Sequence, residues 1–222
     1  MNRSKIKKAI ILGGSSGIGK AISKSIVNDV HNIIACSSKD IDTSNLDSVN
    51  NFINYHKKTD ILVLNSGGPP AKNFFQISED EWLKYYNQLF FSLCLILQKL
   101  KINKNGFIFY ISSVTIKNPS SNLILSTAYR VAFSSVLKSL SKEFLKKNIS
   151  IINIAPGSFL TRRTLELVGK KNIKKIAKTL PTGVIADPKE IGEFVSYIIK
   201  NNIRQLSGNT IFFDGSQSDF IF

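Results

Sequence analysis

The sequence predicts an α/β fold with a parallel sheet and helices on both faces. Two observations lead to this prediction. Short apolar runs of strand length alternate with longer helical stretches along the 222 residues, and a glycine-rich segment joins the first run to the first helix. Steady alternation of this kind gives parallel strands, and right-handed crossovers then wind the helices over both faces. The length suits a single domain, 1–222.

The expected strands are apolar runs between turn-forming segments, and the expected helices lie between them. The strands are 8–12, 32–36, 60–65, 106–112, 149–155 and 209–213. The helices are about 17–29, 44–57, 79–101, 126–147 and 187–201. The segment SNLD (44–47) has the pattern of a capping box, which places the start of the second helix.

Lysine dominates the charge of the chain, which is formally +15 with only five arginines. We interpret most of these lysines as solvated. A basic chain could bind nucleic acid, but this is the least favoured of the three functions that the sequence allows. Two distant cysteines indicate a reducing, cytoplasmic setting, and two histidines leave no material for a zinc site. With so few histidines and cysteines, no metal is expected. The apolar stretch 89–100 is too short to span a bilayer, so no membrane partner is expected.

A glycine-rich loop, LGGSSGIGK (12–20), follows the first strand and opens the first helix. Glycines there allow a tight turn and let the backbone approach a pyrophosphate, which the free N–H groups of the helix start can bind. Glycine also serves ordinary turns. The position between strand and helix nevertheless favours a dinucleotide cofactor.

This loop resembles that of the short-chain dehydrogenase/reductase family, and further motifs extend the resemblance over about residues 7–216. The motifs are LNSG (64–67), DTSNLDSV (42–49), YISSV (110–114), APGSFLT (155–161), PTGVIADPKEIGEFV (181–195) and LSGNTIFFDGS (206–216). Members such as the 3-oxoacyl carrier-protein reductases are similar. The resemblance implies a Rossmann-like doubly wound fold, an NAD(P) cofactor and a carbonyl or alcohol substrate. The cofactor-binding positions that it implies are Gly13, Ser15, Ser16, Gly17, Ile18, Gly19, Ser37, Asp42, Asn65, Ser66, Gly67, Arg130, Pro156, Gly157 and Thr161.

The adenosine end departs from the family pattern. Ser37 stands where relatives that prefer NAD carry an acid, and Lys39 is nearby, so NADP(H) is favoured over NAD(H). Asp42, at the expected adenine contact, follows after only five residues. The helix and strand that the family places between these positions are largely absent. We therefore expect a sheet shortened between strands 2 and 4.

The catalytic positions are altered as well. The family uses Asn, Ser, Tyr and Lys, and Ser113 matches the serine. Counting about thirteen residues onward gives Ser126 at the tyrosine position, and Arg130 then takes the place of the lysine. The same kind of count from Trp82 puts Leu89 at the asparagine position. The NSGGPP turn (65–70) resembles that of a branch with similar changes, so Ser113, Ser126 and Arg130 are the expected catalytic residues.

The proton donor is accordingly atypical. Tyr129 either packs at the helix surface or reaches the pocket from one side, since it lies three residues from Ser126 on the same helix. The proton could otherwise come through Ser126 from water, or from the substrate's own acidic group. The lost tyrosine and lysine also leave open a catalytically inactive NAD(P)-binding sensor or scaffold.

Two further expectations concern partners. The segment of about 158–186 is the family's substrate lid, and its basic residues fit either a small-molecule substrate that is anionic or carrier-linked, or a solvated amphipathic helix. The helices 79–101 and 126–147 resemble the pair that the family packs into a four-helix interface. A homodimer or homotetramer is therefore expected.

Overall fold

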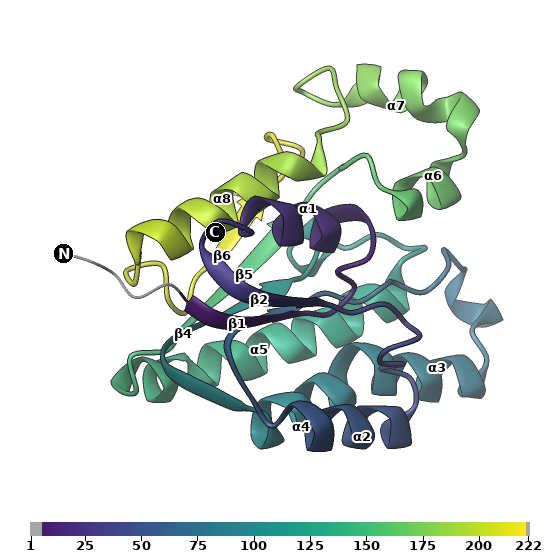
Figure 1. The fold of residues 1–222 in the computed structure, drawn as a ribbon. Coiled ribbons are helices and arrows are strands. Elements are labelled where there is room, and N and C mark those ends of the chain that lie inside the picture. Colours follow the sequence, from purple (N-terminus) through teal and green to yellow (C-terminus); the bar gives the residue numbers. More distant parts are fainter. Residues whose placement is uncertain (1–5, 221–222) are drawn as a thin grey trace.

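A computed structural model describes residues 6–220, and its centre is a six-stranded sheet in which all strands are parallel. The strands are β1 (Ile6–Ile11), β2 (Val30–Ala35), β3 (Lys58–Leu64), β4 (Lys101–Ile111), β5 (Ser150–Pro156) and β6 (Thr210–Phe213). They lie in the order β2-β1-β3-β4-β5-β6 (Figure 1). This confirms the predicted fold class. The shortening is also present, because β2 is the edge strand and one helix leads from it to β3.

Helices cover the sheet on both sides (Figure 1). One face carries α1 (Gly17–Ser25) and α8 (Pro188–Asn201). The other carries α2 (Leu46–His56), α3 (Glu79–Tyr86), α4 (Ser92–Lys99) and α5 (Ile124–Lys146). Between β5 and α8, the helices α6 (Arg162–Val168) and α7 (Ile173–Thr179) project away from the sheet (Figure 1). Within residues 6–220, no helix has the length and apolar character needed to cross a membrane.

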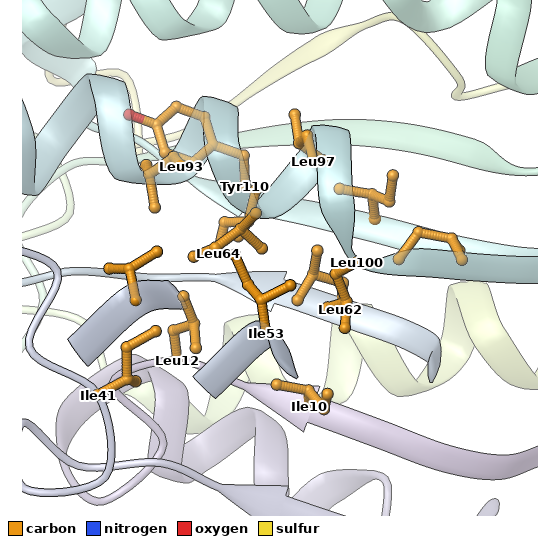
Figure 2. Close-up of a cluster of buried hydrophobic side chains, with 14 of the residues drawn as sticks. Ile10, Leu12, Ile41, Ile53, Leu62, Leu64, Leu93, Leu97, Leu100 and Tyr110 are labelled. Carbon is orange, nitrogen blue, oxygen red and sulfur yellow. The ribbon is translucent and has the colours of Figure 1, made fainter. Parts of the chain in front are cut away.

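Two apolar clusters hold these layers together, because alternate residues of a strand point to opposite faces of the sheet. Tyr110 and Leu62 belong to the cluster under α2, α4 and α5, whereas Phe109 and Val63 belong to the cluster under α1 and α8. Figure 2 shows part of the first cluster, including Leu93 and Leu97 of α4 and Leu62 and Leu64 of β3. Strands buried on both faces read as continuous apolar runs, which is why the sequence reveals them.

The start of α2 differs from the prediction. Its N-cap is Asn45, whose side chain accepts hydrogen bonds from the N–H groups of the second and third residues that follow, at 2.9 and 3.0 Å. Ser44 instead donates its hydroxyl to the carboxylate of Asp42 at 2.7 Å. The predicted capping box at 44–47 is therefore wrong. Asparagine is as good an N-cap as serine, so the sequence alone could not separate these neighbours.

The helix predicted at 79–101 is interrupted. A π-helical turn, η2 (Asn87–Phe91), separates α3 from α4, and the N–H of Ser92 bonds to the carbonyl of Asn87. This turn holds Leu89, which is fully buried. It also directs Gln88 to the carbonyl of Gly67 at 2.8 Å. The wider turn thus ties the helix to the loop after β3, and π turns of this kind are frequent at functional sites.

Candidate active site

A cavity of about 400 Å³ opens at the carboxyl ends of β1, β3, β4 and β5. The strand order reverses between β1 and β3, and ligands of open parallel sheets bind at such a switch point. The cavity brings together most of the residues that the sequence singles out: Gly13, Ser16, Gly17, Ile18, Asn65, Ser66, Gly67, Ser113, Ser126, Arg130, Pro156, Gly157 and Thr161. Ser15, Gly19, Ser37 and Asp42 do not line it.

The glycine loop has a shape that a dinucleotide fits. Gly13 and Gly17 have φ angles of +60° and +51°, which side chains with a Cβ rarely adopt. A Cβ on Gly19 would lie 2.3 Å from the carbonyl oxygen of Gly13. At the start of α1, the side chain of Ser16 makes no capping hydrogen bond, and the first turn has no acid. The N–H groups of this helix start are therefore suited to an anionic phosphate.

Asn65 supports the same loop from the end of β3. Its side-chain amide donates to the carbonyl of Gly13 at 3.3 Å. On the other side, the Thr161 methyl group is 3.3 Å from the place that a Cβ on Gly17 would take. Thr161 is the N-cap of α6, where its hydroxyl oxygen accepts from the N–H of Thr164 at 3.2 Å. The start of α6 is thereby held against the glycine loop.

Arg130 is the most constrained polar side chain of the site. It is only 6% exposed. Its guanidinium donates to the carbonyls of Ile111 and Ser66, each at 2.9 Å, and its Nε donates to the Ser126 hydroxyl at 3.1 Å. The ion pairs found among residues 6–220 do not include it. Because the groups that hold this buried cation are neutral, its positive charge is not compensated by them and acts on the cavity. Some of its five N–H donors also stay free to bind a ligand.

Two serine hydroxyls line the same cavity. The Ser126 oxygen accepts from Arg130, and the Ser113 oxygen accepts from both the N–H and the hydroxyl of Thr115, at 3.2 and 3.0 Å. In the described part of the chain, neither serine donates its own proton to a protein acceptor. Both O–H groups can therefore donate to a ligand oxygen, and the bond from Arg130 strengthens Ser126 as a donor.

Tyr129 lies outside this arrangement. Its hydroxyl donates to the carbonyl of Trp82 at 3.0 Å, and its ring meets the rings of Trp82 and Tyr86 edge-on, each with centroids 5.9 Å apart. It does not line the cavity. Burial, and to a lesser extent Tyr86, raises the pKa of Tyr129, which makes it a weaker acid. The geometry agrees with the packing alternative for this tyrosine.

The loop after β2 carries an acid that the sequence analysis overlooked. The carboxylate of Asp40 accepts from both the N–H and the hydroxyl of Ser37, each at 2.7 Å, and these bonds lower the pKa of Asp40. The Asp40 carboxylate thus places a negative charge beside Ser37, the position at which relatives that prefer NAD carry an acid. In an S-x-x-D segment the acid can reach back to the N–H of the serine, as the acid of a capping box does, and this pattern is the available sequence signal. Asp42 is bonded to Ser44, and its adenine contact stays a prediction.

The lid segment divides into solvated and inward-facing charges. Arg162 pairs with Glu166 at 2.7 Å on the exposed side of α6, and the lysines between 170 and 178 are exposed. Both arginines line the cavity, but Arg163 is partly buried and donates to the carbonyl of Pro69. Burial is the main cause that lowers the pKa of Arg163. The solvated interpretation therefore describes the lysines, and Arg163 is the partly buried basic residue of the lid at the site.

A doubly wound parallel sheet with a glycine loop after β1 and a polar cavity at the switch point defines a dinucleotide-binding protein of the Rossmann-like class. Residues 18–216 match the family model described as enoyl-(acyl carrier protein) reductase. The chain belongs to the short-chain dehydrogenase/reductase family, which makes it an oxidoreductase by family.

Similar proteins match along nearly the whole chain. The 3-oxoacyl-[acyl-carrier-protein] reductase FabG of Chlamydia pneumoniae is 23% identical, covering 94% of this chain and 96% of its own. The 7alpha-hydroxysteroid dehydrogenase of Escherichia coli K12 is 24% identical, covering 94% and 93%. The crystal structure of L-sorbose reductase from Gluconobacter frateurii, complexed with NADPH and L-sorbose, superimposes with a TM-score of 0.87 at 20% identity, covering 98% of each chain. A Francisella tularensis short-chain dehydrogenase family protein gives 0.86 at 21%, covering 96% and 99%.

Proposed function

We propose that the protein is an NAD(P)(H)-dependent oxidoreductase that interconverts a carbonyl and an alcohol without the tyrosine and lysine of its family. Ser113, Ser126 and Arg130 are the catalytic residues of this proposal. The observation that carries it is the buried Arg130, which bonds to Ser126 inside the cavity that the glycine loop also lines.

The residues divide the chemistry as follows. A bound NAD(P)H would supply the hydride that forms the new C–H bond at the carbonyl carbon. Ser113 and Ser126 donate hydrogen bonds to the carbonyl oxygen, and the charge of Arg130 stabilises the oxyanion as it develops. Arginine does not lose its proton in proteins, so it acts as a fixed charge. The proton that completes the alcohol passes from water through the Ser126 hydroxyl. Serine is a far weaker acid than tyrosine, which predicts slow turnover on ordinary ketones.

NADP(H) is the proposed cofactor in preference to NAD(H). Ser37 carries no charge that would repel a 2′-phosphate, and Lys39 lies in the same loop. The L-sorbose reductase that shares the fold was crystallised with NADPH. Asp40 works in the opposite direction because its carboxylate is bonded to Ser37. We therefore expect a narrow preference for NADP(H), which removal of the Asp40 charge would widen.

The proposed partners are a small anionic or carrier-linked substrate and a second copy of the chain in a homodimer or homotetramer. The Chlamydia relative is named for a carrier-linked substrate. For self-association, α3 and α5 leave apolar side chains exposed, with Leu83 at 64%, Val131 at 42% and Tyr86 at 37%. We also propose a cytoplasmic setting, in keeping with two free cysteines.

Titration with NADPH and NADH, followed by the fluorescence of the reduced nicotinamide, tests the proposal. We expect saturable binding of NADPH that Arg130→Ala weakens, together with slow NADPH consumption in the presence of carbonyl compounds. Binding without any consumption across a broad carbonyl panel would favour the sensor or scaffold alternative. Absence of binding would refute the proposal.

A further inference from the structure

We propose that Arg163 binds the carboxylate of a short oxo acid whose carbonyl oxygen is held by Ser126. The substrate class of the proposed reaction is then an oxo acid with its carboxylate one or two carbons from the reacting carbonyl, and the product is the matching hydroxy acid. This inference rests on the proposed function for the direction of the chemistry. The recognition of the acid itself is a separate, measurable property.

Gly68 reveals the space between the two groups. A Cβ built on Gly68 would lie 3.8 Å from the Ser126 hydroxyl oxygen and 3.8 Å from both Nε and Nη2 of Arg163. One small volume is therefore within reach of a hydroxyl donor and a guanidinium fork. Ligand oxygens bonded to them would each stand at about 2.8 Å. A short ligand with two oxygen-bearing ends fits such a space.

The charges around this space call for an anion. Arg163 is partly buried, and the ion pairs formed within the described chain leave it without a carboxylate. Arg162, its neighbour, takes Glu166 instead. Arg130 lines the same cavity and also has no ion pair among the described residues, so with Arg162 three guanidinium groups line it, and Glu166, the partner of Arg162, offsets only part of this charge. Placing like charges together in a half-buried site is unfavourable unless a ligand compensates them. A carboxylate matches the planar fork of arginine.

The apolar residues that line the cavity indicate which group the remainder of the ligand carries. Leu123, Leu167 and Val168 line it beside Arg163 and supply an apolar surface. A short alkyl chain attached to the oxo acid would pack there. Reduction then adds a hydride to the carbonyl carbon and a proton to its oxygen, while the carboxylate stays ionised on Arg163. The reductant is the nicotinamide cofactor of the proposed function.

The phosphates of the cofactor are a second source of negative charge. The site that fits them is the uncapped start of α1, at Ser16 and Gly17. Thr161 packs against Gly17, whereas Arg163, two residues further along, lies near Gly68 and donates to the carbonyl of Pro69. This placement favours the substrate's carboxylate. The experiment separates the two sources.

The test is calorimetric titration with pairs of ligands, a charged acid and its neutral methyl ester, on the protein with and without NADPH. The pairs are 2-oxobutanoate with its methyl ester and 3-oxobutanoate with its methyl ester. We expect at least one acid to bind about tenfold or more tightly than its ester, because a charge-assisted bidentate contact is lost in the ester. Arg163→Gln should remove this preference without changing the affinity for the ester. Arg163→Lys should keep part of it, and the control Lys174→Gln, which removes an exposed lid cation that does not line the cavity, should keep all of it.

Two outcomes would overturn the inference. The first is equal binding of acid and ester by the unaltered protein, and the second is an acid preference that survives Arg163→Gln. If NADPH affinity is lost in that variant while the preference survives, the arginine is assigned to the cofactor. Thermal melting of each variant checks folding. The NADPH titration alone reports on the proposed function, so a protein that fails to bind NADPH but discriminates the acids would refute that function and support this inference.

Discussion

Replacing Arg130 with methionine removes the charge at the centre of the site and keeps a side chain of similar length. The carbonyls of Ile111 and Ser66 each lose a bond of 2.9 Å. A buried acceptor without a partner costs about 1–3 kcal/mol, and water from the adjoining cavity offsets part of this cost, so we expect a loss of about 2 kcal/mol. Such a loss lowers the melting temperature of a chain of this size by about 4–8 °C.

Cofactor affinity is the more direct measure, because removing a buried unpaired charge also relieves a desolvation penalty in the free protein. We expect Arg130→Met to weaken NADPH binding about tenfold or more, which corresponds to about 1.4 kcal/mol per tenfold. Arg130→Lys should recover part of the affinity, since it restores the charge but not the three-way bonding. Fluorescence titration and thermal melting measure both effects. A methionine variant with unchanged affinity and unchanged melting temperature would refute the account of this residue.

Three other predictions follow. Asp40→Asn should raise the ratio of NADP(H) to NAD(H) affinity, measured by parallel titrations, because it removes a negative charge bonded to Ser37; an unchanged ratio would place the 2′-phosphate elsewhere. Hydrogen bonds from Lys72 and Ser78 lower the pKa of Glu81 below 4.5. The ionised Glu81 therefore stabilises the fold fully above pH 4.5, and this stabilisation is lost as the pH falls through the lowered pKa of the folded state. Glu81→Gln should make stability less dependent on pH in this range, and identical acid unfolding curves for the two proteins would contradict this. Light scattering should show a dimer or tetramer that Val131→Glu weakens, and a monomeric unaltered protein at micromolar concentration would contradict it.

Much of the fold could be predicted from the sequence because its signals are local. The strands are buried on both faces, so they stand out as apolar runs such as ILVL at 61–64. The glycine loop is recognisable because its spaced glycines lie between the first strand and the first helix. Counting from Ser113 brings Ser126 and Arg130 to the same cavity, since residues four apart share a face of a helix.

Two of the remaining features depend on contacts between distant segments, and two depend on competition or turns within a few residues. The π turn at Asn87–Phe91 and the inward path of Arg163 are set by the loop after β3, with which Gln88 and Arg163 form hydrogen bonds. The periodicity of apolar residues in the sequence does not predict these hydrogen bonds between distant segments. The choice of Asn45 over Ser44 as N-cap is a competition between neighbours of similar capping strength. Asp40 was overlooked because a turn of three residues brings it back to Ser37.

The most direct measurement of the central claim compares the turnover of Ser126→Ala, Arg130→Ala and Tyr129→Phe on one substrate, together with their NADPH affinities. We expect Ser126→Ala to lower turnover by about 10²-fold or more, as the loss of a group that transfers a proton does. Arg130→Ala should lower both turnover and affinity. Tyr129→Phe should change neither by more than a small factor, since its hydroxyl is bonded to the carbonyl of Trp82. Turnover abolished by Tyr129→Phe, with both quantities intact in Ser126→Ala and Arg130→Ala, would contradict the claim.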